Sequence, residues 1–318
     1  MVLWIVLVAV FIVSLIIVIK TADLFVNNLV KIGEHLGISQ IILGVTVSAI
    51  GTSLPEFGSA MIAVLTGSPD IGVGVVIGSN IWNIAGIIGI SALISCFIET
   101  NRDEIIRDGS MTLLTVLILL FFMIIIGEIT KITGIVLIVV YIGYIWILIK
   151  AQKKYYTYKN PNKIARKPIN HKNILFAIVG LIGLIVGCRI LVYSGVELAR
   201  IANIPEMIIG LFALAIGTSA AELTVAITSA RKKMCSLSLG TVLGSNIFNI
   251  LLGVGIPALI INIPVEPLSV IFDAPVLIFV TILLLIFMKS NLEISRAEGI
   301  ILMGIYAIYA IIRIFILT

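Results

Sequence analysis

Long apolar runs alternate with short polar segments along the whole chain. About 20 apolar residues are enough for a helix to cross the hydrocarbon core of a bilayer. Ten runs of that order are predicted to be membrane-spanning helices: Val2–Ile19, Ile41–Leu65, Ile71–Ile98, Met111–Ile126, Ile132–Ile149, Ile174–Leu191, Ile208–Ser229, Leu237–Leu259, Leu268–Met288 and Gly299–Leu317. The pattern predicts an all-α polytopic membrane protein with ten transmembrane helices in two groups of five.

The composition excludes a soluble protein. Of the 318 residues, 60% are apolar and only 12% are charged, whereas soluble domains carry about 25% charged residues. Cys96, Cys188 and Cys235 are odd in number and lack metal-ligand spacing, which argues against a disulfide scaffold. The net charge of +5 is carried by predicted loops, so we expect no nucleic-acid partner and no cofactor.

Basic residues gather in alternate loops. The predicted inner loops hold sixteen Lys and Arg residues and the outer positions hold three, and such an excess marks the cytoplasmic side. The first run has no basic residue before it, so it is not a cleaved signal peptide. We expect a cell (inner) membrane protein with both termini extracellular and a cytoplasmic connector at 150–172.

The two halves of the chain repeat each other. A shift of 166 residues superimposes identical polar and glycine residues: Ala49–Ser53 on Ala215–Ser219, Glu56 on Glu222, and Gly78–Ile81 on Gly244–Ile247. The predicted organisation is a five-helix repeat over 1–149, a basic connector over 150–173 and a second five-helix repeat over 174–318. Because five is odd, the repeats must be inverted relative to each other, as in many secondary transporters.

Two glutamates, Glu56 and Glu222, lie in the middle of predicted spans. A carboxylate at that depth is costly and is functional by default. Pro55 interrupts the second span and frees backbone carbonyls beside the hydroxyls of Thr52 and Ser53. Carboxylates, hydroxyls and carbonyls are the ligands of hard cations, above all Ca²⁺.

A second motif opens the third and eighth spans. Ser79 and Asn83 share one helix face, and Ser245 and Asn249 repeat this arrangement. Their neighbours Asn80 and Asn246 have an alternative role as interhelical hydrogen-bonding residues. Asp273 is expected at a span end, and Arg313 can extend its side chain to the surface.

Two pairs of motifs resemble the alpha-repeats of the cation/calcium antiporter superfamily, in its prokaryotic sodium/calcium exchanger branch: GTSLPE at Gly51–Glu56 with GSNIWNI at Gly78–Ile84, and GTSAAE at Gly217–Glu222 with GSNIFNI at Gly244–Ile250. The resemblance covers essentially the whole chain. It implies an antiporter, not an enzyme, that moves Na⁺ and Ca²⁺ by alternating access. The resemblance also implies broken helices 2 and 7, and a first and a sixth helix that slide across the other eight.

The resemblance also implies roles for single residues. Glu56 and Glu222 would be the main Ca²⁺ ligands, helped by Thr52 and Thr218. Sodium would use both glutamates and further oxygens: the carbonyls of Ala49 and Ala215 and the side chains of Ser53, Ser79, Ser219 and Ser245. Asn83 would complete the centre, and Asn249 is its repeat equivalent.

The chain departs from the family pattern in two places. Ala220 and Ala221 replace the usual Leu-Pro, so helix 7 is expected to be less sharply broken than helix 2. Asn249 stands where some relatives carry an acid, which argues against potassium coupling and leaves two central carboxylates.

Three other functions compete with Na⁺/Ca²⁺ exchange. A Ca²⁺/H⁺ antiporter of the same fold is the main alternative, although proton-coupled relatives usually carry a GN-containing motif beside the acid. A channel would more often build its filter from symmetric subunits. An intramembrane enzyme is disfavoured because no catalytic set is found. We expect the protein to work as a monomer surrounded by lipid.

Overall fold

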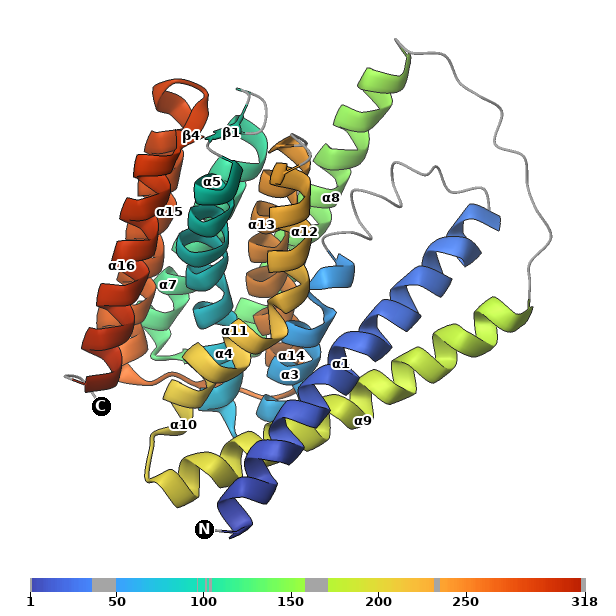
Figure 1. Ribbon diagram of the computed structural model, residues 1–318, viewed down its shortest axis with the longest axis vertical. Helices are drawn as coiled ribbons and strands as arrows, with labels where there is room; N and C mark the ends of the chain where they lie inside the picture. The colour runs from blue at the N-terminus through green and yellow to red at the C-terminus, as the bar shows by residue number, and fades with distance from the viewer. Residues whose placement is uncertain are drawn as a thin grey trace.

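The computed structural model describes residues 2–35, 50–95, 97–100, 102, 105–157, 171–231 and 235–315. The chain is nearly all helical, because a backbone in hydrocarbon must satisfy its own hydrogen bonds. Four long helices are α1 (Val2–His35), α8 (Lys131–Thr157), α9 (His171–Ala202) and α16 (Arg296–Phe315). α1 and α9 lie side by side at one flank of the molecule, and α16 lies at the opposite flank (Figure 1).

The remaining helices form the body of the molecule between these flanks. In the first half they are α3 (Leu54–Leu65), α4 (Pro69–Ile81), η1 (Trp82–Ile88), α5 (Gly89–Ser95), η2 (Ile105–Gly109) and α7 (Ser110–Ile126). In the second half they are α10 (Glu206–Ile208), η3 (Ile209–Leu214), α11 (Ala215–Thr218), α12 (Ala220–Arg231), α13 (Cys235–Phe248), η4 (Asn249–Val254), α14 (Gly255–Ile260), η5 (Ser269–Asp273) and α15 (Ala274–Ser290).

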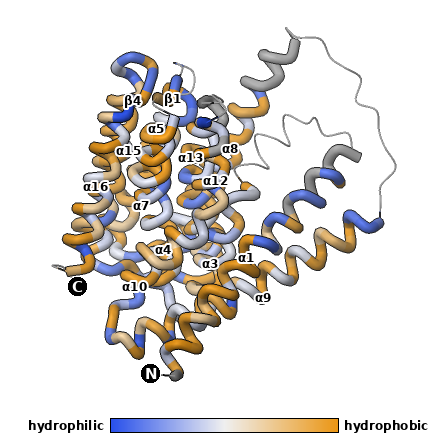
Figure 2. The backbone as a smooth tube through the Cα atoms, in the orientation of Figure 1, coloured by the Kyte–Doolittle hydropathy of each residue, from blue (hydrophilic) through white to orange (hydrophobic). Residues whose placement is uncertain are grey.

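The protein is a multi-pass membrane protein by the length and apolarity of its helices. Within the described residues, eight helices are long and apolar enough to span a bilayer, or nine if the bent pair Glu206–Thr218 and Ala220–Arg231 is one span. The predicted second span, 41–65, is described only from residue 50, and its α3 is a shorter apolar helix. Hydrophilic residues gather at the end of the body that carries β1 and β4 (Figure 2).

The described residues are nearly all helical, as the all-α prediction expects, and four short strands among them connect the helices. β1 (Phe97–Glu99) pairs antiparallel with β4 (Glu293–Ser295), and β2 (Glu128–Ile129) pairs antiparallel with β3 (Ile263–Pro264). These segments follow the ends of helices, where extended backbones from the two halves satisfy each other's hydrogen-bonding groups. The predicted third span therefore ends at Ser95 and not at Ile98.

Glycines allow the two halves to approach closely at the centre. A Cβ added to Gly78 of α4 would lie 2.2 Å from the Leu211 carbonyl oxygen of η3. One added to Gly210 of η3 would lie 2.6 Å from the Ile71 carbonyl oxygen. Helix packing in membranes depends on small residues of this kind. The contact holds α4, whose residues from Ile71 to Ile81 are all buried, against the opposite half.

Candidate cation site

Both central glutamates lie in the first turn of a helix that begins after an interruption. Glu56 follows Ser53, which separates the helical residues 50–52 from α3, and Pro55 lies in the first turn of α3. Glu222 follows Ser219, where the chain bends by 44° between α11 and α12. The amino end of a helix stabilises negative charge. Each carboxylate therefore lies where backbone dipoles offset part of its burial cost.

The two glutamates are fully buried and are held by serines of the opposite half. Ser53 Oγ donates to Glu222 Oε1 at 2.9 Å, and Ser219 Oγ donates to Glu56 Oε1 at 2.7 Å. Both the serines and the glutamates are related by the same shift of 166 residues. The structure thus brings the two repeated motifs together as a reciprocal pair of hydrogen bonds.

Hydroxyls from the second motif extend this cluster. Ser245 Oγ of α13 lies 3.3 Å from Glu222 Oε1 and 3.4 Å from Thr52 Oγ1. The hydroxyl of Ser79 donates to the Val75 carbonyl within α4. All of these serine and glutamate side chains are buried, and the Ser245 hydroxyl connects Glu222 with Thr52.

The other predicted ligands of helix 7 lie on the same segment. Thr218 is buried, and its hydroxyl donates to the Leu214 carbonyl at 2.7 Å. Ala215 is also buried, and its carbonyl accepts the Ser219 amide at 3.2 Å. The predicted role of Ala49 lies outside the described residues.

Four asparagines of the second motif are fully buried, and three of them are connected by hydrogen bonds. Asn83 Nδ2 donates to Asn246 Oδ1 at 2.9 Å, and Asn246 Nδ2 donates to the Asn80 carbonyl at 3.1 Å. Asn246 therefore takes the interhelical hydrogen-bonding role that the sequence left open, whereas the side-chain amide of Asn80 donates to the Val76 carbonyl within α4 at 2.7 Å. Asn249 differs from them, because neither polar atom of its side chain has a partner among the described residues.

Several buried oxygens of the cluster lack a hydrogen-bond partner among the residues that the structure describes. They are Glu56 Oε2, Glu222 Oε2, Asn80 Oδ1, Asn83 Oδ1 and Asn249 Oδ1. An unpaired buried polar atom is costly, and a hard cation satisfies such oxygens directly. The cluster therefore has the chemistry of a site for Na⁺ or Ca²⁺ as cargo.

Comparisons with known proteins agree with this chemistry. A family model described as sodium/calcium exchanger protein matches residues 6–150 and 172–315. The chain belongs to this family. It is 31% identical to the sodium/calcium exchanger MaX1 of Methanosarcina acetivorans, over 95% of this chain and 97% of that one. It also resembles the solved sodium-calcium exchanger NCX_Mj, with a TM-score of 0.66, 30% identity and coverage of 96% and 97% of the two chains.

The relatives include proteins without an assigned activity. An uncharacterised membrane protein of Methanocaldococcus jannaschii is 31% identical over 94% of this chain and 95% of its own length. Membership nevertheless confirms the resemblance that the paired motifs indicated, in the prokaryotic branch of the cation/calcium antiporters. This exchanger is accordingly a membrane antiporter of the sodium and calcium transport class.

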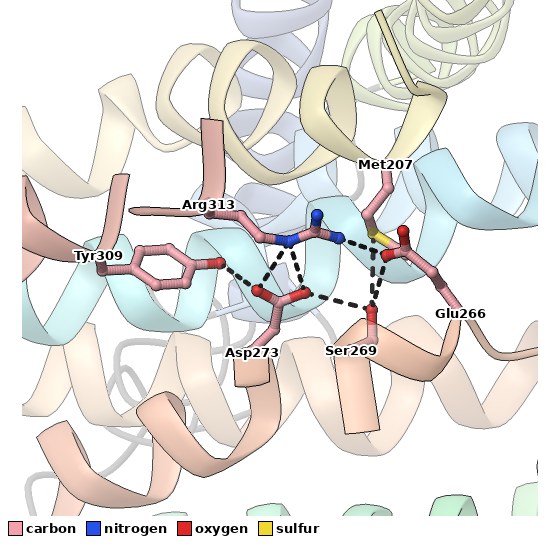
Figure 3. A network of polar contacts seen from close by, with 6 residues as sticks. All are labelled: Met207, Glu266, Ser269, Asp273, Tyr309 and Arg313. Atoms are coloured by element: carbon pink, nitrogen blue, oxygen red, sulfur yellow. Dashed lines mark hydrogen bonds and ion pairs between the residues drawn. The ribbon is translucent and has the colours of Figure 1, made fainter. Parts of the chain in front are cut away.

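The exchanger also has a buried ionic network that sequence reasoning missed (Figure 3). Arg313 is fully buried, and its Nε donates to Asp273 Oδ1 at 3.2 Å, while its Nη2 pairs with Glu266. Tyr309 OH donates to Asp273 Oδ1 at 3.0 Å. Arg313 does not extend to the surface, and Asp273, near the start of the span Ser269–Ser290, is fully buried, because the end of α16 packs on η5 and covers both.

The first half contains a related pair. Tyr144 OH of α8 donates to Asp108 Oδ1 of η2 at 3.0 Å. A shift of 165 residues carries Asp108 to Asp273 and Tyr144 to Tyr309. The repeated Asp–Tyr spacing was available in the sequence, although only the structure shows that the side chains meet. The network's outermost acid, Glu266, has its pKa raised by burial, and the Arg313 guanidinium opposes this shift.

Proposed function

We propose that this exchanger moves Na⁺ in one direction and Ca²⁺ in the other through one central site built on Glu56 and Glu222. The observation that carries the proposal is the reciprocal bonding of each glutamate to a serine of the opposite half. It supports a single site shared by both halves. The choice of the two ions is supported by the relatives MaX1 and NCX_Mj, which are named as sodium/calcium exchangers.

The ligand set is proposed to match the sequence prediction. Glu56 and Glu222 bind Ca²⁺ with Thr52 and Thr218. Sodium uses the same glutamates, the oxygens of Ser53, Ser79, Ser219 and Ser245, and the carbonyls of Ala49 and Ala215. Asn83 completes the centre, and Asn249 adds an amide whose polar atoms have no partner in the described part of the chain.

The charge of the site explains why exchange would be obligatory. Two carboxylates neutralise one Ca²⁺, and the same oxygens cannot hold Ca²⁺ and Na⁺ together. The family implies a stoichiometry of three Na⁺ for one Ca²⁺. With three Na⁺ bound to the two carboxylates, the site would have a net charge of +1. The transport cycle would then be electrogenic.

The proposed architecture is ten helices in two inverted repeats, 1–149 and 174–318, joined by the connector 150–173. The strand pairs support it, because β1 and β3 follow equivalent helices and each pairs with a strand of the other half. Helices 2 and 7 are broken at Ser53 and Ser219. The termini are extracellular, the connector is cytoplasmic, and the protein works as a monomer in the lipid of the inner membrane.

Alternating access is proposed to involve α1 and α9. These two helices contact each other along much of their length and lie at one flank of the body (Figure 1). Most of their large apolar side chains are exposed, as expected for lipid contact. A pair of this kind can slide over the body and uncover the site from one side and then the other.

The test is uptake of radiolabelled Ca²⁺ into proteoliposomes loaded with Na⁺ and placed in Na⁺-free medium. Choline-loaded vesicles and vesicles with a pH gradient are the controls. We expect uptake only with internal Na⁺. Uptake that needs only the pH gradient would replace Na⁺ by H⁺ as the coupling ion, and uptake without any counter-ion would contradict antiport.

A further inference from the structure

The helices α1 and α9 pack so closely that they form one unit. Three glycines of α9 meet α1 directly: an added Cβ would lie 2.6 Å from Phe25 N at Gly180, 2.5 Å from Thr21 Cγ2 at Gly183 and 3.0 Å from Val18 Cγ2 at Gly187. Close approach through small residues gives tight helix pairs in membranes. Motion between the two helices is therefore less favourable than motion of the pair as a whole.

This pair contacts the body through a hollow beside the cation site. Cys188 of α9 is fully buried against Gly58 of α3, two residues after Glu56. An added Cβ at Gly58 would lie only 2.7 Å from Cys188 Sγ. Ser59 Oγ donates to the same sulfur at 3.9 Å. The thiol thus occupies space that exists only because residue 58 has no side chain.

The hollow is one residue long. One turn away on α3, Leu54 and Ile62 carry large side chains that pack on the hydrophobic core. A shift of α9 along α3 would move the thiol from the glycine toward one of these side chains. The contact between Cys188 and Gly58 is therefore made at one position of α9 only.

A second contact between the pair and the body is more adaptable. An added Cβ at Gly217 of α11 would lie 2.8 Å from Leu15 Cδ2 of α1. The end of a leucine side chain can rotate away, whereas a buried cysteine has one short side-chain torsion. The Cys188 contact is the more position-specific of the two.

We propose that Cys188 and Gly58 are positioning residues that set the balance between the two access states of the exchanger. The proposal rests on the proposed function, in which α1 and α9 slide over the body. A contact made in one state only stabilises that state and shifts the population toward it. A change at the hollow should therefore alter access without altering the ligands.

The test is Gly58→Ala, with transport measured separately in right-side-out and inverted membrane vesicles. The added methyl group overpacks the hollow and disfavours the state described here. We expect the Ca²⁺ concentration for half-maximal exchange to rise about threefold or more on one side of the membrane and to fall on the other. The maximal rate should fall, because turnover needs both states.

The matched rescue is Gly58→Ala combined with Cys188→Ala. The Cys188 Cβ lies 3.8 Å from the position of the added Cβ, which is an ordinary contact. In the double variant, the Ca²⁺ concentrations for half-maximal exchange on the two sides of the membrane should therefore equal those of Cys188→Ala alone. Gly143→Ala is the control, because an added Cβ there meets nothing within 4 Å. It should leave exchange unchanged.

The outcomes separate this proposal from the proposed function. If wild-type vesicles exchange Ca²⁺ for Na⁺ but Gly58→Ala changes both sides equally, or lowers only the amount of folded protein, the positioning role is wrong and antiport stands. If the double variant keeps the half-maximal Ca²⁺ concentrations of Gly58→Ala, the contact with Cys188 is not the cause of their shift. If wild-type vesicles show no Na⁺-dependent exchange, the proposed function itself fails.

Discussion

Each central glutamate depends on a residue from the other half of the chain. A buried carboxylate in a membrane is expensive, and one hydrogen bond from Ser53 or Ser219 offsets only part of that cost. The second oxygen of each carboxylate has no partner among the described residues. A cation bound at the proposed site would supply the missing interaction.

The first prediction concerns the glutamates themselves. Glu56→Gln and Glu222→Gln each remove one of the two negative charges that are proposed to neutralise Ca²⁺. We expect each change to abolish Na⁺-dependent Ca²⁺ uptake, with an unchanged elution profile in gel filtration. Glu128→Gln is the matched control, because Glu128 lies on β2 and its Oε1 accepts from the exposed Asn262 amide at 3.3 Å. Near-normal transport by either central variant would refute the site.

The second prediction concerns the reciprocal serines. Ser219→Ala removes the donor to Glu56, and Ser53→Ala removes the donor to Glu222. A hydrogen bond to a charged group contributes about 1.5–3 kcal/mol, so each change should weaken cation binding about tenfold or more. Calorimetric titration of the purified protein with Ca²⁺ and with Na⁺ measures this. Unchanged affinities would show that neither hydroxyl contributes to the bound state.

At the scale of elements, π-helical segments adjoin the polar motifs of both halves. η1 begins at Trp82 directly after α4, and η4 begins at Asn249 directly after α13. A π-helical turn carries an extra residue and is frequently found at functional sites. Here it changes the direction of the side chains that follow the GSN segments.

The third prediction concerns the ionic network that fastens α16. Arg313→Met leaves the fully buried Asp273 without its cationic partner, and breaking a buried ion pair costs about 3–5 kcal/mol. We expect a marked fall in the midpoint of thermal unfolding in detergent. Arg313→Met with Asp273→Asn should recover part of the loss, because the unpaired charge is gone.

Arg200→Met is the control for this network. Arg200 pairs with Glu197, but 76% of its side chain is exposed, and exposed pairs contribute little. Its unfolding midpoint should stay close to that of the wild type. A similar fall for both arginines, or none for Arg313, would contradict the structural role of the network.

The sequence indicated which side chains lie together better than it predicted the details of the elements. The identical residues at a shift of 166 occur inside apolar spans, where polar residues are costly, so they indicated which residues would meet. The strand pairs and π-helical turns could not be predicted, because they depend on contacts between distant segments. The burial of Asp273 and Arg313 was missed for the same reason: hydropathy finds the end of a helix but not what covers it.

In the whole molecule, the proposed inverted repeats require the two halves to have opposite orientations in the membrane. The inner and outer loops were assigned from the distribution of Lys and Arg, which is a statistical rule about insertion. Orientation is therefore a separate prediction from the fold.

The fourth prediction tests this orientation by cysteine labelling. In a background without Cys96, Cys188 and Cys235, Asn162→Cys probes the connector and Asn262→Cys probes the exposed segment before β3. We expect a membrane-impermeant maleimide to label residue 262 in intact cells and residue 162 only after permeabilisation. The reverse pattern would invert the topology and leave the site unchanged.

The most direct test of the central claim is equilibrium binding of radiolabelled Ca²⁺ to the purified exchanger, with increasing Na⁺ at constant ionic strength. If Glu56 and Glu222 form one shared site, Na⁺ should displace Ca²⁺ completely, choline should not, and the double variant Glu56→Gln with Glu222→Gln should bind no Ca²⁺. Ca²⁺ that stays bound at saturating Na⁺, or that still binds to the double variant, would contradict a single shared site.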